Sequence, residues 1–313
     1  MRKAFVGATL LAVFVWGGAP VRTQTAESHY DHLVRLSSTY QVSLDVVYRT
    51  INNWDAKLDI IRPRQSSTPT PTVLFFHGGG WTGGSKDAGL LAALPYAEMG
   101  YAVVNVAYRL SSVSLAPAAV EDTRCALRWI YRNAKQYNLD LNRLVLTGQS
   151  AGGHLALITG MLTEDAGLDL GCPGDRGAGA FNTDPLKVAA IVNWYGITDV
   201  REMIAGPNRR AYAVMWLGGQ PNREQIATQV SPLTYVRPGL PPVITIHGDA
   251  DPTVPYTQAQ RLHEALQKAG VTSQLVTVPK GGHGGFTVDE NVRIYTAIRS
   301  FLTKHVGVVT SSN

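Results

Sequence analysis

The chain has 313 residues, of which 45% are hydrophobic and only 16% are charged. This composition excludes an intrinsically disordered protein, which would be rich in charge and poor in apolar residues. With only two cysteines, the chain is not a small disulfide-rich scaffold either. The length allows one large domain or two smaller ones. The formal net charge of +5 raises the question of an acidic partner, so the positions of the basic residues matter.

The first 26 residues have the organisation of a secretory signal peptide. Arg2 and Lys3 precede an apolar run over residues 4–15, and the residues that follow are small or polar. The run is shorter than the roughly 20 apolar residues that span a membrane. No cysteine follows it that could carry a lipid anchor. We therefore expect an exported protein, periplasmic or extracellular, with a mature domain at residues 27–313 and no stable membrane anchor; a buried first helix is the alternative.

Export changes the charge of the protein. The expected signal peptide holds three basic residues and no acidic one, so the mature chain would carry a net charge of only +2. Its basic residues form no cluster larger than a pair such as Arg209-Arg210, and aromatic residues do not alternate with them. The sequence therefore does not indicate a nucleic-acid-binding surface.

The two cysteines allow a single intramolecular pairing. Cys125 lies in a segment with helical spacing, and Cys172 lies in a Gly-rich stretch. An oxidising compartment would permit a disulfide between them. Sequence does not show whether the two are close enough to bond, so two separate thiols remain the alternative.

In chain order, the mature sequence predicts strands that alternate with helices. Two strands joined by a polar turn at Asn52-Asn53 come first, at residues 42–48 and 57–62. Further strands are predicted at residues 73–77, 102–107, 144–147, 188–194, 243–247 and 274–278, and helices at 88–98, 120–136, 151–162, 256–268 and 291–305. This alternation predicts an α/β fold with a mostly parallel central sheet and helices on both faces.

Two stretches have no regular pattern. Residues 163–184 are rich in Gly and Asp and follow a helix. Residues 197–240 follow a strand, so they begin at the carboxyl edge of the sheet, where ligands bind in open α/β folds. We expect the second stretch to form a small cap over a substrate pocket.

The most specific motif is Gly148-Gln149-Ser150-Ala151-Gly152. It lies between a predicted strand and an apolar helix, the context of a nucleophile elbow. Small flanking residues let the turn close tightly and let substrate approach the serine. The helix that follows presents its amides and positive dipole end to a developing oxyanion. The bare pattern also occurs by chance in loops, but the flanking strand and helix favour the catalytic interpretation.

A second motif, His-Gly-Gly-Gly-Trp at residues 77–81, ends another predicted strand. Consecutive glycines let the backbone aim several N–H groups at one point. We expect the amides of Gly79 and Gly80, together with that of Ala151, to form an oxyanion hole. A structural turn is the alternative, and a phosphate loop is disfavoured because no Lys-Ser/Thr pair follows.

A serine nucleophile needs a base, and the base needs an orienting carboxylate. Asp249 and Asp251 both lie just past a predicted strand. His283 follows the next strand, with glycines on both sides that suit an exposed imidazole. The order Ser150, Asp251, His283 is one in which serine hydrolases place their triads.

The remaining histidines fit other roles. His154 in the nucleophile helix is expected to pack, and His247 at a strand end is expected to pack or cap the turn. His77 fits an orienting or packing role better than that of a base. No His, Cys and Asp cluster has metal-ligand spacing, and no dinucleotide-binding glycine pattern is present. The sequence therefore predicts neither a metal nor a cofactor.

With these motifs, the chain resembles the α/β-hydrolase superfamily over residues 42–305. The resemblance is closest to carboxylesterases with the His-Gly-Gly-Gly-Trp motif, such as bacterial feruloyl and acetyl xylan esterases and hormone-sensitive-lipase-type esterases. It implies Ser150 as nucleophile and His283 as base. It favours Asp251 over Asp249 as the orienting acid, because the family's acid precedes the Pro-Thr-Val-Pro turn.

The resemblance also assigns binding groups. It implies oxyanion amides at Gly79, Gly80 and Ala151 and a place for Trp81 in the pocket lining; we also expect Trp216, in the expected cap, to contact substrate. Two features depart from the hormone-sensitive-lipase type: a glutamine precedes the serine where an acid is usual, and the segment before the first strand is short for a helical cap. Both favour the exported polysaccharide-esterase branch.

The sequence thus predicts an exported serine carboxylic ester hydrolase that acts through an acyl-enzyme. The expected substrates are short acyl or aromatic-acid esters, as small molecules or linked to plant polysaccharides. A serine peptidase or amidase of the same fold is the alternative that residues 247–255 suggest. A non-catalytic binding protein is disfavoured, because all three triad candidates are present.

Overall fold

The computed structural model describes residues 29–168, 170–172 and 186–308. The chain forms two units, Met1–Ser38 and Thr39–Asn313. The predicted signal peptide at residues 1–26 lies outside the described residues and stays a prediction. Helix α1 (His29–Thr39), which sequence reasoning did not predict, begins the described part.

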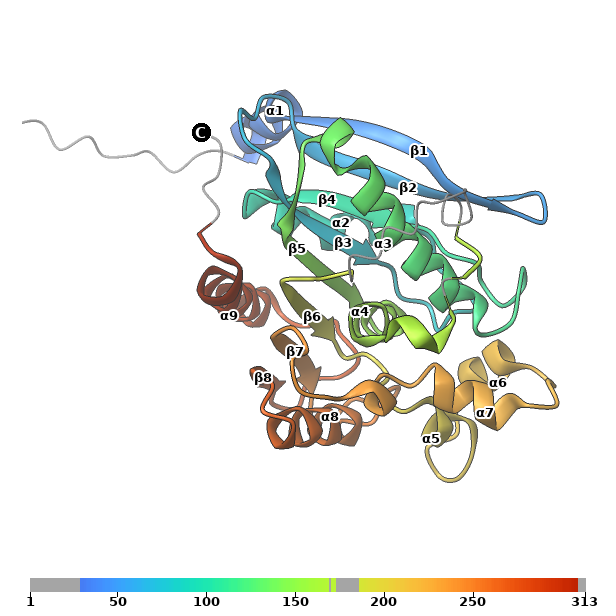
Figure 1. The fold of residues 1–313 in the computed structure, drawn as a ribbon. Coiled ribbons are helices and arrows are strands. Elements are labelled where there is room, and N and C mark those ends of the chain that lie inside the picture. Colours follow the sequence, from blue (N-terminus) through green and yellow to red (C-terminus); the bar gives the residue numbers. More distant parts are fainter. Residues whose placement is uncertain (1–28, 169, 173–185, 309–313) are drawn as a thin grey trace, which may run out of the picture. The chain divides into compact units, whose positions relative to one another are not determined.

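The second unit is built on one eight-stranded sheet in the order β1-β2-β4-β3-β5-β6-β7-β8 (Figure 1). The strands are β1 (Tyr40–Ile51), β2 (Trp54–Pro63), β3 (Thr70–Phe76), β4 (Ala102–Val106), β5 (Leu139–Gln149), β6 (Ala190–Trp194), β7 (Val243–Gly248) and β8 (Ser273–Val278). Strand β2 is antiparallel to both β1 and β4, whereas each pair along the rest of the sheet, β4-β3-β5-β6-β7-β8, is parallel. The predicted mostly parallel sheet is therefore confirmed.

Five longer helices cover the two faces of this sheet: α2 (Lys86–Glu98), α3 (Ala118–Tyr137), α4 (Ala151–Met161), α8 (Thr257–Lys268) and α9 (Val288–Val306). Buried side chains of α3, α4 and α8 share one core, and those of α2 and α9 share the other. Strand β3 serves both cores, because Leu74 and Phe76 enter the first while Val73 and Phe75 enter the second. Each buried side chain of this size contributes about 1.5–3 kcal/mol.

The predicted elements correspond to observed ones, with differences at their ends. Strand β5 begins at Leu139, five residues before its predicted start, because the polar stretch that precedes its apolar run also pairs with β3. Of the irregular stretch after α4, the structure describes a short 3₁₀ helix, Glu164–Ala166, and the region of Cys172; residues 169 and 173–184 lie outside the described part. Cys172 forms a disulfide with Cys125 of α3, so the two-thiol alternative is wrong.

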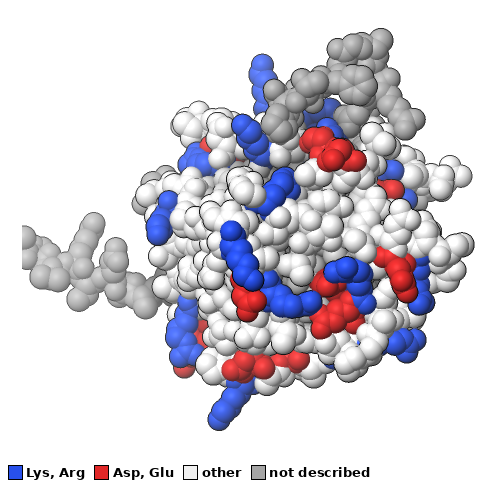
Figure 2. All heavy atoms as spheres, turned by 60° about the horizontal axis from the view of Figure 1, so that its bottom comes forward, with Lys and Arg blue, Asp and Glu red and all other residues white. Residues whose placement is uncertain are grey.

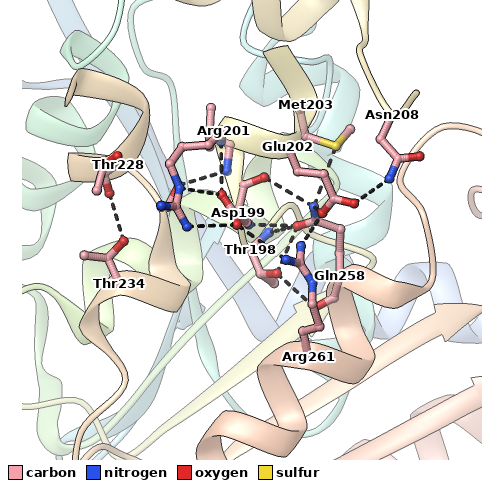
Figure 3. Close-up of polar contacts among 12 residues, drawn as sticks. Thr198, Asp199, Arg201, Glu202, Met203, Asn208, Thr228, Thr234, Gln258 and Arg261 are labelled. Atoms are coloured by element: carbon pink, nitrogen blue, oxygen red, sulfur yellow. Dashed lines mark hydrogen bonds and ion pairs between the residues drawn. The ribbon is translucent and has the colours of Figure 1, made fainter. Parts of the chain in front are cut away.

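The predicted cap at residues 197–240 contains three short helices and a 3₁₀ turn: α5 (Val200–Ile204), α6 (Ala211–Leu217), α7 (Arg223–Gln229) and Pro232–Tyr235. The buried side chain of Gln258 in α8 forms hydrogen bonds with the first residues of the cap (Figure 3). Its amide oxygen accepts from the backbone N–H groups of Thr198 and Asp199, both at 2.8 Å. Its amide nitrogen donates to the carboxylate of Glu202 at 2.6 Å. One glutamine therefore ties the cap to the helix that follows the acid turn.

Ion pairs surround this glutamine. Arg261 contacts Asp199 and Glu202, and Arg201 also pairs with Asp199. Figure 2 shows the face that comes forward when the bottom of Figure 1 is turned toward the viewer, where basic and acidic side chains lie interspersed. The arginines of these pairs are exposed although Asp199 is buried, and ion pairs open to solvent contribute little each, so the buried amide of Gln258 is expected to dominate this attachment.

Replacing Gln258 by leucine should lower the free energy of unfolding by about 2–4 kcal/mol, because two buried backbone N–H groups lose their acceptor. Urea unfolding followed by circular dichroism measures the change. Gln260→Leu is the matched control, because Gln260 is exposed on the same helix, and it should change stability by no more than about 0.5 kcal/mol. Equal effects of the two substitutions would contradict the role given to Gln258.

Candidate active site

Ser150 lies in the sharp turn between β5 and α4, with φ 56° and ψ −118°. This backbone conformation is unfavourable for a residue with a side chain. The turn closes because a glycine follows at position 152: a Cβ there would lie 2.0 Å from the carbonyl oxygen of Phe76. The Ser150 N–H also donates to the carbonyl of Trp194 at 2.9 Å. The elbow predicted from the sequence is therefore present, and it presents the serine hydroxyl at the carboxyl edge of the sheet.

Two loops bring a histidine and an aspartate to this hydroxyl. His283 lies between β8 and α9, and its Nε2 is 2.8 Å from Ser150 Oγ. Its Nδ1 is 2.7 Å from Oδ2 of Asp251, in the turn after β7. With hydrogen on Nδ1, the imidazole donates to the carboxylate and accepts from the serine hydroxyl. The structure thus brings together all three side chains that the sequence singled out.

The carboxylate of Asp251 is held as an anion. Burial alone would raise its pKa, but hydrogen bonds from His247, His283 and the Val254 backbone outweigh it, and the pKa lies well below its usual range. The other candidate, Asp249, is exposed and accepts from the Lys280 backbone instead. The geometry therefore favours Asp251, as the resemblance implied.

The loop after β3 approaches the serine from the other side. Gly79 and Gly80 have φ of +116° and +59°, which side chains rarely adopt. A Cβ on Gly80 would also lie 2.8 Å from that of Tyr212. No described residue accepts a hydrogen bond from the N–H groups of Gly79, Gly80 or Ala151. Their place beside Ser150 is compatible with an oxyanion hole, which stays a prediction.

Trp81 and Trp216, which were predicted to contact substrate, do not line the pocket beside Ser150. Both side chains are fully buried, and the two rings stack on each other at 4.1 Å. Trp81 donates from Nε1 to Nδ1 of His154 at 3.2 Å, and His154 Nε2 bonds the carbonyl of Val230 at 2.7 Å. These residues support the glycine loop and the cap from inside. Their aromatic character was visible in the sequence, but their burial depends on how the cap folds back.

His154 and His77 have the packing roles expected of them. Burial lowers the pKa of His154 to about 4, so this imidazole is neutral at physiological pH. Burial also lowers the pKa of His77, whose ring stacks on that of Tyr108 at 4.3 Å. Neither side chain lies in the pocket.

The cavity above Ser150 has a volume of about 300 Å³. It is lined by Gly78, Gly79, Gly80, Gln149, Ser150, Tyr195, Tyr212, Thr253 and His283. Sequence reasoning did not place Tyr195 or Thr253 there. Tyr195 directly follows β6 at the carboxyl edge, and its ring packs edge-on against that of His283 at 4.6 Å. Its position immediately after a buried parallel strand was the signal that could have revealed it.

Within residues 29–168, 170–172 and 186–308, no group of three or more His, Cys, Asp or Glu residues is placed to hold a metal ion. No helix in the same part of the chain is long and apolar enough to cross a membrane. Three groups are hydrogen-bonded in a line at the pocket: the hydroxyl of Ser150, the imidazole of His283 and the carboxylate of Asp251.

Comparison with known proteins places the chain among esterases. Residues 58–266 match the BD-FAE family model. Esterase LipQ of Mycobacterium tuberculosis is 26% identical over 74% of this chain and 55% of its own length. Esterase LipC of the same organism is 28% identical over 72% of this chain and 56% of its own length. The chain thus spans about half the length of these curated relatives.

Two solved structures match this chain over nearly their whole length. A truncated carbohydrate esterase from gut microbiota has a TM-score of 0.72 and 25% identity, covering 86% of this chain and 97% of that one. Esterase 2 of the Planctomycetes species Thermogutta terrifontis has a TM-score of 0.69 and 26% identity, covering 89% and 96%. The sheet, its helices and the family match over more than half of the sequence agree: the chain has the α/β-hydrolase fold and belongs to the BD-FAE family.

Proposed function

We propose that this protein is a serine carboxylic ester hydrolase that works through an acyl-enzyme. The observation that carries the proposal is the line of hydrogen bonds from Ser150 Oγ through His283 to Asp251. The relatives described above are all named esterases, which supports ester rather than amide substrates.

In the proposed reaction, Ser150 Oγ attacks the ester carbonyl carbon while His283 Nε2 takes the hydroxyl proton. The tetrahedral intermediate collapses, the bond to the alcohol oxygen breaks, and His283 gives its proton to the departing alcohol. A water molecule then attacks the acyl-enzyme with the same imidazole as base, releasing the acid and restoring the serine. Asp251 keeps the imidazole in the tautomer that accepts at Nε2 and stabilises the transient imidazolium.

The negative charge of the tetrahedral intermediate needs donors that are already oriented. We assign this role to the N–H groups of Gly79, Gly80 and Ala151, which flank Ser150 without a described acceptor. The N-terminal end of α4 adds its positive dipole at the same point.

Ser150→Ala should lower kcat for p-nitrophenyl acetate by about 10⁴-fold or more, because the nucleophile is lost. The wild type should gain one phosphoryl adduct from paraoxon, measured by intact mass spectrometry, and the variant none. Ser114→Ala, outside the pocket, is the control and should behave as the wild type. Wild-type activity in Ser150→Ala would refute the mechanism, and faster cleavage of peptide amides than of matched esters would favour the peptidase alternative.

The pocket also supports a substrate with a polar alcohol part. The pocket is lined by the side-chain amide of Gln149 and by the hydroxyls of Tyr195 and Thr253. None of these three groups forms a hydrogen bond with another described side chain or backbone group. Polar groups placed in this way pair best with hydroxyls of the ligand. We therefore propose short acyl or aromatic-acid esters of sugars, a substrate class in keeping with the similarity to the carbohydrate esterase from gut microbiota.

Thr253→Val and Tyr195→Phe each remove one hydroxyl and keep the shape of the side chain. We expect kcat/KM for an acetylated xylo-oligosaccharide to fall about 3- to 10-fold in each variant, because one hydrogen bond is lost. Activity on p-nitrophenyl acetate, whose leaving group offers no hydroxyls, should stay within about twofold. Equal losses on the two substrates would contradict the sugar assignment.

We propose that the protein is exported by the segment at residues 1–26. The sequence order of that segment and the disulfide between Cys125 and Cys172 both suit an oxidising compartment. Sequencing the N-terminus of protein recovered outside the cytoplasm should show cleavage near residue 26. A variant without residues 4–15 should remain inside the cell, and an exported product with an intact N-terminus would contradict cleavage.

A further inference from the structure

His247, at the end of β7, lies beside the proposed triad, although its sequence context suggested only packing or turn-capping. Its side chain is fully buried. Nε2 is 3.0 Å from the carbonyl oxygen of Val254 and 3.3 Å from Oδ2 of Asp251. Nδ1 has no partner among the described residues, and the ring packs edge-on against Tyr256. The imidazole therefore directs one nitrogen at two oxygens and leaves the other without a partner.

The two oxygens determine which nitrogen carries the hydrogen. A neutral imidazole has one N–H. On Nε2 this hydrogen points at the oxygens of Val254 and Asp251. On Nδ1 it would be buried without an acceptor, which would cost free energy of folding. His247 thus directs its N–H at the Val254 carbonyl and, 3.3 Å away, at the carboxylate that orients His283.

The contacts of Asp251 show what this donor adds. Oδ1 accepts from the backbone N–H groups of Thr253 and Val254 at 2.7 and 3.0 Å. Oδ2 faces only two described donors, His283 at 2.7 Å and His247 at 3.3 Å. Without His247, the oxygen that orients the base would have that base as its single described partner.

We propose that His247 is a positioning residue of the triad: it fixes the rotation of the Asp251 carboxylate and draws part of its negative charge away from His283. This inference rests on the proposed function, because it concerns the same three residues. A carboxylate that shares less of its negative charge with a second partner stabilises a neighbouring imidazolium more strongly. Loss of the donor should therefore move the titration of His283 upward.

The other groups that face Asp251 do not titrate in the relevant range. Burial raises the pKa of Tyr195 and of Tyr212 well above the usual value, so both phenols stay neutral. Arg210, which donates to the carbonyl of Thr253, keeps its positive charge. The acidic limb of a kcat/KM profile should therefore report His283.

His247→Leu removes the donor at similar volume. For p-nitrophenyl acetate, we expect kcat to fall about 10- to 100-fold and the acidic limb of kcat/KM to move about half to one unit toward higher pH. His247→Gln should restore most of the rate and the wild-type limb, because the glutamine amide nitrogen can reach the same oxygens as Nε2. His263→Leu is the matched control: His263 is buried in α8, and its Nε2 has no described partner, so the limb should not move.

A purely structural role gives a different pattern. In that case His247→Leu would lower stability or kcat while the acidic limb of kcat/KM stayed in place, or His247→Gln would be as impaired as His247→Leu. Either result overturns the proposal. If the leucine variant does not fold, Gln and Asn at position 247 form the test, because the shorter asparagine cannot reach Asp251 and should show the shifted limb.

A second readout separates this inference from the proposed function. The hydrogen between His283 Nδ1 and Asp251 should give a strongly downfield proton NMR signal that moves in His247→Leu and returns in His247→Gln. If the wild-type protein had no esterase activity, the proposed function would be refuted. The NMR signal would still test the positioning role of His247. A signal that is the same in all three proteins would overturn the inference.

Discussion

The site depends on one close approach, between the start of α4 and the end of β3. With glycine at position 152, the helix backbone lies where a Cβ would be 2.0 Å from the Phe76 carbonyl oxygen. That approach forces Ser150 into its unfavourable backbone conformation and sets it beside the glycine loop that follows β3. The strain is local, and the apolar cores on both faces of the sheet stabilise it. The hydroxyl and the candidate oxyanion amides are therefore positioned together.

The parallel sheet explains why the remaining groups meet at this point. Strands β5, β7 and β8 all end at the same edge, so the residues just beyond them gather there although they are far apart in sequence. The turn with the acid and the loop with the base are also joined directly, because the Ala250 N–H donates to the Gly281 carbonyl at 3.0 Å. The carboxylate and the imidazole are consequently aligned before any substrate arrives.

Local patterns were enough to predict the sheet, its five longer helices, Ser150 and His283, while the choice of Asp251 over Asp249 came from the family resemblance. Each depends on features within a few residues, such as an apolar run followed by glycines around Ser150 or His283. The sequence could not show that Trp81 is buried, because its partners His154 and Trp216 come from a helix and a cap far along the chain. The second contact of Asp251 depends in the same way on how the turn after β7 folds back onto His247.

Two buried histidines, His154 and His247, lie outside the pocket lining, of which Gln149 and Thr253 form part. His154 and His247 each place Nε2 against the carbonyl of a loop, at Val230 in the cap and at Val254 in the acid turn. These contacts hold the backbone of the cap and of the turn that carries Asp251 in place. Neither contact involves a side chain of the pocket lining. The side chains of Gln149 and Thr253 line the pocket and form no hydrogen bond with the side chains of Ser150, His283 or Asp251. Differences in ester preference among proteins with this arrangement should therefore arise from the pocket lining, while His247 acts on the carboxylate that orients the base.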